Sequence, residues 1–256
     1  FVSPLFRRIF TRADFVQTIS HYLADFARNM GYLRTLEVVP NAVDIAHFSQ
    51  TYLTDELFAL KQKLGKSTND IFLITTSRLV KKNAVDEVIR ALPLLGNRVK
   101  FLVLGIGPDE AVLRALADEL KVSDRVKFLR QISHKEMPKY LKVSDIFIRP
   151  SRSEGLGNSF LEAMAAGIPV IATPVGGIPD FLLDPAKNPD HEPTGYFCEV
   201  DNPQSIATQV NKILSDEALR TRIIRNAKKL VTEKYDWSLI AHDMKEKVFD
   251  KLFARK

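Results

Sequence analysis

The stretch "DIFLITTSRLVKKNAVDEVIRALPLLGNRVKFLVLG", residues 70–105, decides the fold class of this 256-residue chain. Residues 70–78 and 99–105 are nearly continuous apolar and β-branched runs, as in strands that are buried on both faces. Between them, residues 83–95 place apolar side chains at the spacing of one helix face. A strand, a helix and a second strand in this order predict a βαβ unit with parallel strands.

The same alternation of strands and helices continues to residue 173. Further strands are expected at residues 125–129, 145–150 and 169–173, and further helices at residues 107–120 and 133–144. We therefore predict an α/β fold with a Rossmann-like parallel sheet and helices on both faces. Ligands of such sheets bind at the carboxyl ends of the strands, so the loops that follow the strands are the ones to examine.

The two ends of the chain differ from this central pattern. Residues 15–48 contain one expected helix between two short strands, which is too little to bury a core of its own. Because the sequence begins without Met and shows no signal peptide, we expect residues 1–48 to be the last part of a preceding domain. Residues 203–253 are almost entirely helical in pattern.

Composition and charge exclude several classes of protein. The 37 Lys and Arg residues against 31 Asp and Glu give a net charge of +6, which is dispersed rather than gathered in the stripe of a nucleic-acid binder. This dispersion favours solvated helix faces, with anionic ligands or an anionic membrane surface as the alternative. No apolar run approaches the roughly 20 residues that span a bilayer. The single cysteine, Cys198, excludes an internal disulfide and agrees with a reducing compartment.

Familiar catalytic motifs are also missing from the sequence. The five histidines lack metal-ligand spacing, and no Gly-x-Ser-x-Gly elbow, Cys/His pairing or P-loop motif occurs. Any chemistry is therefore expected to depend on Arg, Lys and Glu side chains.

A second stretch, "RSEGLGNSFLEAMAAG" at residues 152–167, places a glycine-rich loop before a short helix. Gly155 and Gly157 indicate that Glu154 belongs to the loop. Glycines let a phosphate approach the backbone closely, and the free amides and dipole of a helix N-terminus favour an anion. The loop is therefore a candidate phosphate site.

Ser159 and Glu162 in the same stretch have the spacing of a capping box, which predicts that Ser159 caps the helix and that Glu162 lies in its first turn. Two carboxylates beside a phosphate are costly unless they accept hydrogen bonds from hydroxyl groups. Sugar hydroxyls on either side of a diphosphate meet that need, which favours a nucleoside diphosphate sugar as the ligand. The alternative is that Glu162 only caps its helix and Glu154 is a solvated loop acid.

Basic residues follow the first strand of the predicted sheet. Arg78 ends the strand and Lys82 comes soon after it, and both types of side chain bind phosphate, although solvated surface charge is the alternative. Gly107, in "GIGPDE", belongs either to an incomplete dinucleotide fingerprint or to a tight turn. Residues 173–180, "TPVGGIPD", add two glycines that either line the same crevice or form a plain turn.

The block "PSRSEGLGNSFLEAMAAGIPVIATPVGGIPD" resembles the signature region of glycosyltransferase family 4, whose members are retaining enzymes with the GT-B fold. Its Glu-x7-Glu element, from Glu154 to Glu162, is the mark of that family. The blocks "SRLVKKNAVDEVIRAL", "FLVLGIGPDE" and "ADFVQTIS…VVPNAVDIAHF" are similar to other family blocks, in the expected order. The resemblance implies the C-terminal half of a GT-B fold. It assigns residues 1–48 to a remnant of the acceptor-binding domain, 49–234 to the donor-binding domain, and 235–256 to a helix that crosses back.

The resemblance also implies roles for single residues. Arg78 and Lys82 are the groups that bind the donor diphosphate and stabilise it as it departs. The family usually shows Arg-Leu-x-x-x-Lys-Gly, whereas Asn83 stands at the usual lysine position here, so Lys82 is chosen on the assumption of a loop one residue shorter. Glu162 binds the ribose hydroxyls, and Glu154 contacts hydroxyls of the transferred sugar. Further donor contacts are assigned to Gly155, Gly157, Asn158, Ser159, Gln131 and Gly107.

The implied reaction moves a hexosyl group from a UDP-, GDP- or ADP-sugar to a hydroxyl group of a glycan or lipid-linked acceptor. By resemblance it retains the anomeric configuration through attack on the same face of the sugar, and it needs neither metal nor cofactor. The same resemblance implies polysaccharide synthesis in the cytoplasm, with peripheral contact at the inner face of the membrane, and no nucleic-acid partner. Two alternatives stay open, a GT-B-type sugar-nucleotide epimerase and a non-catalytic nucleotide-sugar binding module. We expect the 256 residues alone to bind the donor without efficient turnover.

Overall fold

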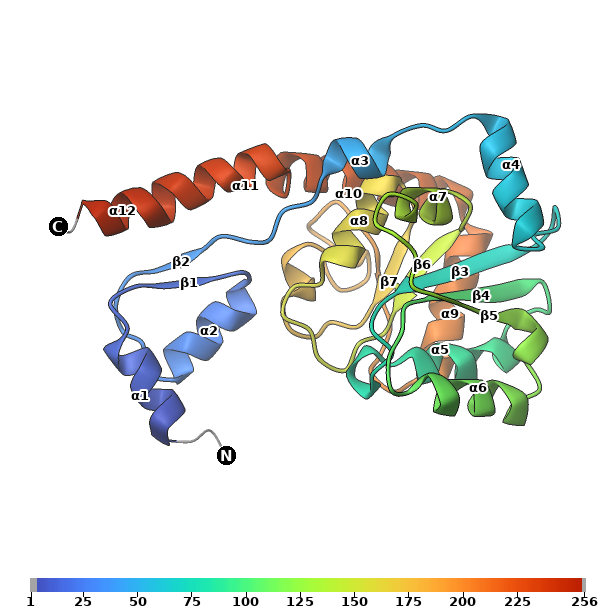
Figure 1. Ribbon diagram of the computed structural model, residues 1–256, viewed down its shortest axis with the longest axis horizontal. Coiled ribbons are helices and arrows are strands. Elements are labelled where there is room, and N and C mark those ends of the chain that lie inside the picture. The colour runs from blue at the N-terminus through green and yellow to red at the C-terminus, as the bar shows by residue number, and fades with distance from the viewer. Residues whose placement is uncertain (1–3, 255–256) are drawn as a thin grey trace.

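A computed structural model describes residues 4–254 of the chain and contains a parallel six-stranded sheet between two layers of helices (Figure 1). The strands are β3 (Ile71–Thr76), β4 (Val99–Leu104), β5 (Val126–Arg130), β6 (Ile146–Arg149), β7 (Val170–Ala172) and β8 (Tyr196–Phe197). Their order across the sheet is β5-β4-β3-β6-β7-β8, and all neighbours pair in parallel. The predicted α/β fold class is confirmed.

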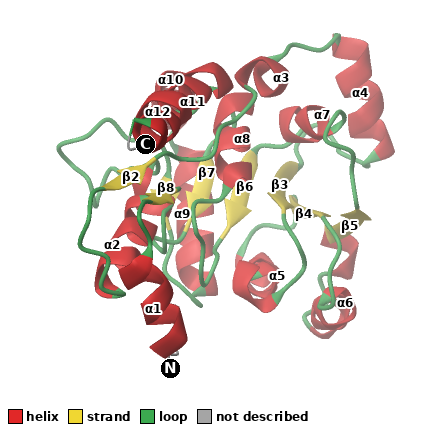
Figure 2. Ribbon diagram, turned by 60° about the vertical axis from the view of Figure 1, so that its left-hand side comes forward, coloured by secondary structure: helices red, strands yellow, loops and turns green. Residues whose placement is uncertain are grey.

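Helices cover both faces of this sheet, as Figure 2 shows. One face carries α5 (Val85–Ala91), α6 (Glu110–Glu119) and α9 (Pro203–Ser215). The other face carries α7 (Met137–Lys142), α8 (Asn158–Ala166) and α10 (Glu217–Lys234). Short 3-10 turns occur at Lys81–Asn83, Leu92–Leu94, Ser123–Arg125 and Ile178–Asp180. The predicted helix over residues 83–95 is thus shortened, because its last turn, which contains Pro93, is a 3-10 turn.

The strands contribute side chains to both layers. In β3, Phe72 and Ile74 pack in the cluster that contains Phe160 of α8, whereas Leu73 packs in the cluster that contains Val88 of α5. Successive residues of a strand point to opposite faces, so a strand covered on both sides must be apolar throughout. This packing explains why the continuous apolar runs predicted the strands.

A small N-terminal unit lies beside the large sheet (Figure 1). It consists of α1 (Pro4–Arg12), β1 (Val16–Thr18), α2 (His21–Asn29) and β2 (Leu36–Val38). Its two strands form a parallel pair that is separate from the six-stranded sheet. The connection to β3 then passes through α3 (Ile45–Ser49) and α4 (Thr54–Lys63).

The C-terminal helices run from the large sheet to this small unit (Figure 1). They are α11 (Trp237–Met244), a π-helical segment (Lys245–Phe249) and α12 (Asp250–Phe253). Val39 of the small unit packs with Ile240 and Val248, and Lys251 Nζ lies 2.5 Å from Glu37 Oε1. The helices therefore contact the N-terminal unit, while the assignment of these segments to functional domains stays a prediction. No helix within residues 4–254 has the length and apolarity needed to cross a bilayer.

Candidate functional site

The centre of the sheet provides a reversal of strand order at which a ligand crevice is expected. From β3 the chain adds β4 and β5 on one side and then returns to place β6 on the other side. The helix that follows β3 covers one face, and the helix that follows β6 covers the opposite face (Figure 2). The loops after β3 and β6 therefore leave the sheet in opposite directions, which opens a crevice at the carboxyl ends of the strands.

A cavity of about 550 Å³ lies at the ends of β3, β4 and β5. Three residues predicted from the sequence, Arg78, Gly107 and Gln131, come from three different loops and line it together. The rest of its wall is formed by Thr76, Ser77, Leu104, Gly105, Ile106, Ile132 and Met137. A mostly apolar wall with one guanidinium and one side-chain amide is the kind of lining that holds a flat ring and a phosphate.

The glycines of the loop after β4 permit its backbone to touch the loop after β3. A Cβ atom on Gly105 would lie 1.8 Å from the Ser77 carbonyl oxygen, and one on Gly107 would lie 2.2 Å from that of Leu79. No side chain fits at such distances. Gly107 therefore serves the packing of the two loops, and that packing holds Arg78 at the edge of the cavity.

Helix α8 begins two residues earlier than the capping-box spacing predicts. Asn158 is its first residue, Gly157 precedes it with φ of +92°, and no side chain caps the first turn. Ser159 lies inside that turn, and its hydroxyl accepts a hydrogen bond from Arg149 Nη1 at 2.7 Å. The prediction that Ser159 caps the helix is therefore wrong, and Glu162 lies in the second turn. The left-handed backbone of Gly157 turns the chain directly into the helix, which leaves the N-terminal amides to bind an anion.

Glu154 is paired and largely buried, with a side chain that is 13% exposed. Its Oε2 accepts a hydrogen bond from Arg149 Nη2 at 2.7 Å, and its Oε1 accepts one from the Gly155 amide at 3.1 Å. The alternative of a solvated loop acid is therefore wrong. Sequence reasoning missed Arg149, which ends β6, whereas Arg78, expected to end its strand, lies two residues beyond the end of β3.

Glu162 lies on α8 where the N-terminal segment packs against that helix. Burial raises the pKa of Glu162, and the charges of Arg149 and of protonated His47 act in the opposite direction. His47 belongs to α3, which contacts α8. Beside it, Asn41 Nδ2 donates a hydrogen bond to Asn158 Oδ1 at 3.1 Å. The segment before the main sheet therefore borders the predicted donor site.

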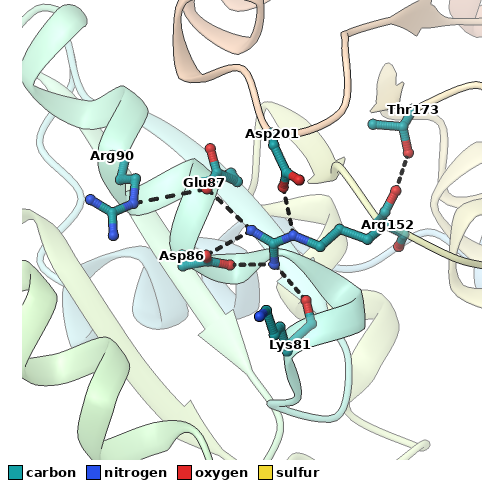
Figure 3. A network of polar contacts seen from close by, with 8 residues as sticks. Lys81, Asp86, Glu87, Arg90, Arg152, Thr173 and Asp201 are labelled. Atoms are coloured by element: carbon teal, nitrogen blue, oxygen red, sulfur yellow. Dashed lines mark hydrogen bonds and ion pairs between the residues drawn. The ribbon is translucent and has the colours of Figure 1, made fainter.

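Arg152 forms a cluster of ion pairs that sequence reasoning also missed (Figure 3). Its guanidinium donates two hydrogen bonds to Asp86, at 2.9 and 2.8 Å, and one to Glu87 at 3.2 Å. Its Nε donates to Asp201 Oδ1 at 2.5 Å. Asp86 and Asp201 raise the pKa of the Arg152 guanidinium, whereas burial raises the pKa of Glu87. The cluster joins the loop after β6 to α5 and to the loop before α9.

The same arginine fixes the loop that carries Lys82. The backbone amide of Arg152 donates to the Lys82 carbonyl at 2.7 Å. Its side-chain Nη1 donates to the Lys81 carbonyl at 2.5 Å (Figure 3). The side chains of Arg78 and Lys82 are both exposed. The structure therefore brings the backbone of the Lys82 loop against the loop that contains Glu154.

The two glycines after β7 pack against the Glu154 loop. Gly176 has φ of +59°, and a Cβ atom there would lie 1.6 Å from the Glu154 carbonyl oxygen. A Cβ atom on Gly177 would lie 2.3 Å from the Gly155 carbonyl oxygen. These glycines thus allow the loop after β7 to pack against the backbone of the candidate phosphate loop. A turn without such a contact would not need glycine at both positions.

Residues 4–254 contain no group of three or more His, Cys, Asp or Glu side chains that could hold a metal ion. The expectation that the reaction needs no metal stays a prediction.

Comparison with known proteins gives a family. Residues 58–230 match the family model described as "Glycosyl transferases group 1". The chain is 31% identical over 210 residues to an uncharacterized glycosyltransferase of Methanocaldococcus jannaschii. The aligned region covers 81% of this chain and 52% of that protein. It is 31% identical over 245 residues to a GDP-mannose-dependent monoacylated alpha-(1-6)-phosphatidylinositol monomannoside mannosyltransferase of Corynebacterium glutamicum. This aligned region covers 91% of this chain and 61% of that protein. The chain thus spans little more than half the length of these relatives.

Solved structures show the same fold. The Anabaena protein HepE, in complex with UDP and glucose, superposes with a TM-score of 0.85 at 22% identity, over 97% of this chain and 68% of that chain. Sucrose-phosphate synthase from Thermosynechococcus elongatus superposes with a TM-score of 0.84 at 24% identity, over 98% of this chain and 61% of that chain. Identities this low show the fold alone. Since the family match spans every loop of the crevice, from Arg78 to Gly177, the chain belongs to the group 1 glycosyl transferases.

Proposed function

We propose that this chain is the donor-binding half of a retaining glycosyltransferase of family 4 and binds a nucleoside diphosphate sugar. The observation that carries the proposal is the meeting of Arg78, Gly107 and Gln131 in one cavity at the carboxyl ends of β3, β4 and β5, next to the reversal of strand order between β3 and β6. The uncapped N-terminus of α8 follows the neighbouring strand, β6. A cavity for a base beside free amides for a diphosphate is the combination that such a donor requires.

The donor contacts follow from these positions. Gln131 and the apolar wall hold the base, and Glu162 accepts hydrogen bonds from the ribose hydroxyls. The amides of Gly157, Asn158 and Ser159 bind the diphosphate together with Arg78 and Lys82. Glu154 accepts a hydrogen bond from a hydroxyl of the transferred sugar, because its carboxylate is already held in place.

The proposed reaction breaks the bond between the anomeric carbon and the diphosphate oxygen and forms a bond from that carbon to the acceptor oxygen. The acceptor attacks the face from which the diphosphate leaves, and the acceptor proton passes to the departing phosphate oxygen. Negative charge grows on that diphosphate in the transition state, where Arg78 and Lys82 stabilise it without a metal. Glu154 is not proposed as a covalent nucleophile, since one of its oxygens is occupied by Arg149 at 2.7 Å.

The names of similar proteins support a nucleotide-linked donor and an acceptor that is a glycan or a lipid. The Corynebacterium relative is named as GDP-mannose-dependent and acts on a phosphatidylinositol mannoside, and HepE was solved with UDP-glucose. We propose that the acceptor is reached from the cytoplasm, at the inner face of the membrane when it is lipid-linked. The acceptor-binding domain corresponds in this proposal to residues 1–48 and to the part of the relatives that the chain does not span. The 256 residues alone are therefore proposed to bind the donor without efficient turnover.

Calorimetric titration of the chain with UDP-glucose, GDP-mannose and ADP-glucose tests the proposal. We expect one donor to bind, and we expect Arg78→Ala and Glu162→Ala to weaken that binding by about 10- to 100-fold, the loss of a hydrogen bond to a charged group. Arg222→Ala is the matched control, because Arg222 pairs with Glu192 on the surface and lines no part of the cavity. Absence of binding for all three nucleotide sugars would refute the proposal. So would donor binding by Arg78→Ala and Glu162→Ala that is as tight as that of the unsubstituted chain.

A further inference from the structure

Arg149 is a buried arginine that pairs with Glu154 and interacts electrostatically with Glu162, the two acids of the proposed donor site. It ends β6 and is 6% exposed. Its Nη2 donates to Glu154 Oε2 at 2.7 Å, and its Nη1 donates to the Ser159 hydroxyl at 2.7 Å and to the Thr76 carbonyl at 3.3 Å. One side chain therefore connects the end of β3, the Glu154 loop and the first turn of α8.

The guanidinium is placed by packing as well as by hydrogen bonds. It stacks over the Phe160 ring, with its central carbon 4.3 Å from the ring centroid. A Cβ atom on Gly157 would lie 3.0 Å from its Nη2 and 2.6 Å from the Phe160 ring, so the backbone just before α8 passes close to both groups. The aromatic face and the nearby backbone leave the guanidinium few alternative positions.

The charge of Arg149 lies in an unusual place, since the N-terminus of a helix is already partly positive. Burial lowers the pKa of this guanidinium, and the charges of Glu154 and Glu162 act in the opposite direction. Glu162 in turn faces Arg149 and His47. A buried cation costs stability unless it is neutralised, and an anion bound at the same helix end would add to the two carboxylates in doing so.

Two buried polar atoms in the region of Arg149 have no hydrogen-bond partner among residues 4–254. Arg149 Nε and the Thr76 hydroxyl are both buried and have no hydrogen-bond partner among the described residues. Thr76 lines the cavity that also contains Arg78. A core built only for stability would satisfy these atoms, so their state favours a functional reason for a cation at this position.

We propose that Arg149 is the positioning residue of the donor site. It holds the Glu154 carboxylate toward the sugar, fixes the first turn of α8 through Ser159, and adds positive charge behind the amides that receive the diphosphate. The inference rests on the proposed function, because it assumes that a nucleoside diphosphate sugar occupies this crevice.

Donor binding by Arg149→Met and Arg149→Lys tests the proposal, with whichever of UDP-glucose, GDP-mannose and ADP-glucose binds the unsubstituted protein. Arg149→Met is expected to weaken binding by about 10- to 100-fold, as for the loss of charged hydrogen bonds. Arg149→Lys keeps the charge but loses the planar fork and its stacking on Phe160, so it is expected to recover only part of that loss. Arg125→Met is the matched control, since Arg125 is also buried, at 7% exposure, and donates to the carbonyls of Val99 and Gly96 away from the crevice. It is expected to change binding less than about twofold, within the additivity of distant sites.

The pH dependence of binding separates a positioning role from a merely structural one. Loss of Arg149 removes a cation that lowers the pKa of Glu162, so protonation of Glu162 is expected to weaken donor binding at a higher pH in Arg149→Met than in the unsubstituted protein. Arg125→Met is expected to keep the original pH profile.

Each outcome of this experiment decides the question. A folded Arg149→Met variant, checked by circular dichroism, that binds donor like the unsubstituted protein would overturn the inference. If Arg149→Met does not fold, Arg149→Lys and Ser159→Ala carry the test, and donor affinity equal to that of the unsubstituted protein in both would overturn it equally. If the unsubstituted protein binds none of the three nucleotide sugars, the proposed function fails first, and that result is distinct from a failure confined to the variants.

Discussion

The backbone amide of Arg152 donates to the Lys82 carbonyl at 2.7 Å, and so joins the loop after β6 to the loop after β3. These loops follow neighbouring strands at the reversal of strand order, which is the place where the donor is proposed to bind. The side chain of Arg152 strengthens this junction through Asp86 and Asp201. Arg152 therefore fixes the two loops relative to each other, although it does not line the cavity that contains Arg78.

Arg152→Ala is expected to destabilise the protein and to weaken donor binding together. The change leaves Asp86 and Glu87 without their cation, and Glu87 is the more costly because its side chain is 9% exposed. We expect a loss of about 2–3 kcal/mol in the free energy of unfolding, below the range for fully buried pairs because Arg152 is partly solvated. Urea unfolding and donor titration measure the two effects. Arg222→Ala, which breaks an exposed pair, is expected to leave both unchanged, and equal effects of the two substitutions would contradict the role of Arg152.

Gly176→Ala is expected to distort the Glu154 loop. The added Cβ atom would meet the Glu154 carbonyl oxygen at 1.6 Å, in a backbone conformation with φ of +59° that alanine disfavours. We expect a loss of about 1–3 kcal/mol in stability, as for overpacking, and weaker donor binding, measured by urea unfolding and calorimetry. Gly96→Ala is the control, because nothing lies within 4 Å of its added Cβ atom. If Gly176→Ala were as stable as Gly96→Ala, the close packing of the two loops would be wrong.

The fold was predictable because its signal is local. A strand covered on both faces must be apolar along its whole length, and the runs at residues 70–78 and 99–105 met that condition before any partner was known. β8 was not predicted as a strand of its own because Tyr196–Phe197 is only two residues long and shows no periodicity. Its pairing with β7 depends on a neighbour that the local pattern does not reveal.

The candidate site was predictable only in part, for the same reason. Arg78, Gly107 and Gln131 follow three strands that end at the same edge, so the sheet topology alone brings them together. The importance of Arg152 comes from Asp86, 66 residues away, and no local pattern marks that pair. The capping-box spacing of Ser159 failed because the left-handed backbone of Gly157 starts the helix earlier.

Cys198 is expected to be chemically inert in the folded protein. Its thiol is 1% exposed, and burial raises its pKa to about 12, so the reactive thiolate is scarce at pH 8. We expect negligible reaction with a thiol reagent such as dithionitrobenzoate at pH 8, and one equivalent of reaction in guanidinium chloride. Fast stoichiometric reaction of the native protein would show that the region around β8 opens.

Glu162→Gln is expected to stabilise the protein at high pH and to weaken its donor binding. Burial raises the pKa of Glu162 in the folded state above its value in the unfolded chain. Between these two pKa values the folded state holds more protons, so the free energy of unfolding decreases as pH rises. At pH 4 the side chain is largely protonated in both states, and the substitution then changes stability little. The difference in melting temperature between Glu162→Gln and the unsubstituted protein should therefore grow from pH 4 to pH 8.

Glu192→Gln serves as the control, because hydrogen bonds from Arg222 lower the pKa of Glu192 and the sign of any effect on stability is opposite. A melting-temperature difference that shrinks toward pH 8 would mean that neighbouring groups stabilise the Glu162 carboxylate in the folded protein. Its burial would then not be a stability cost that is explained by binding of the donor ribose.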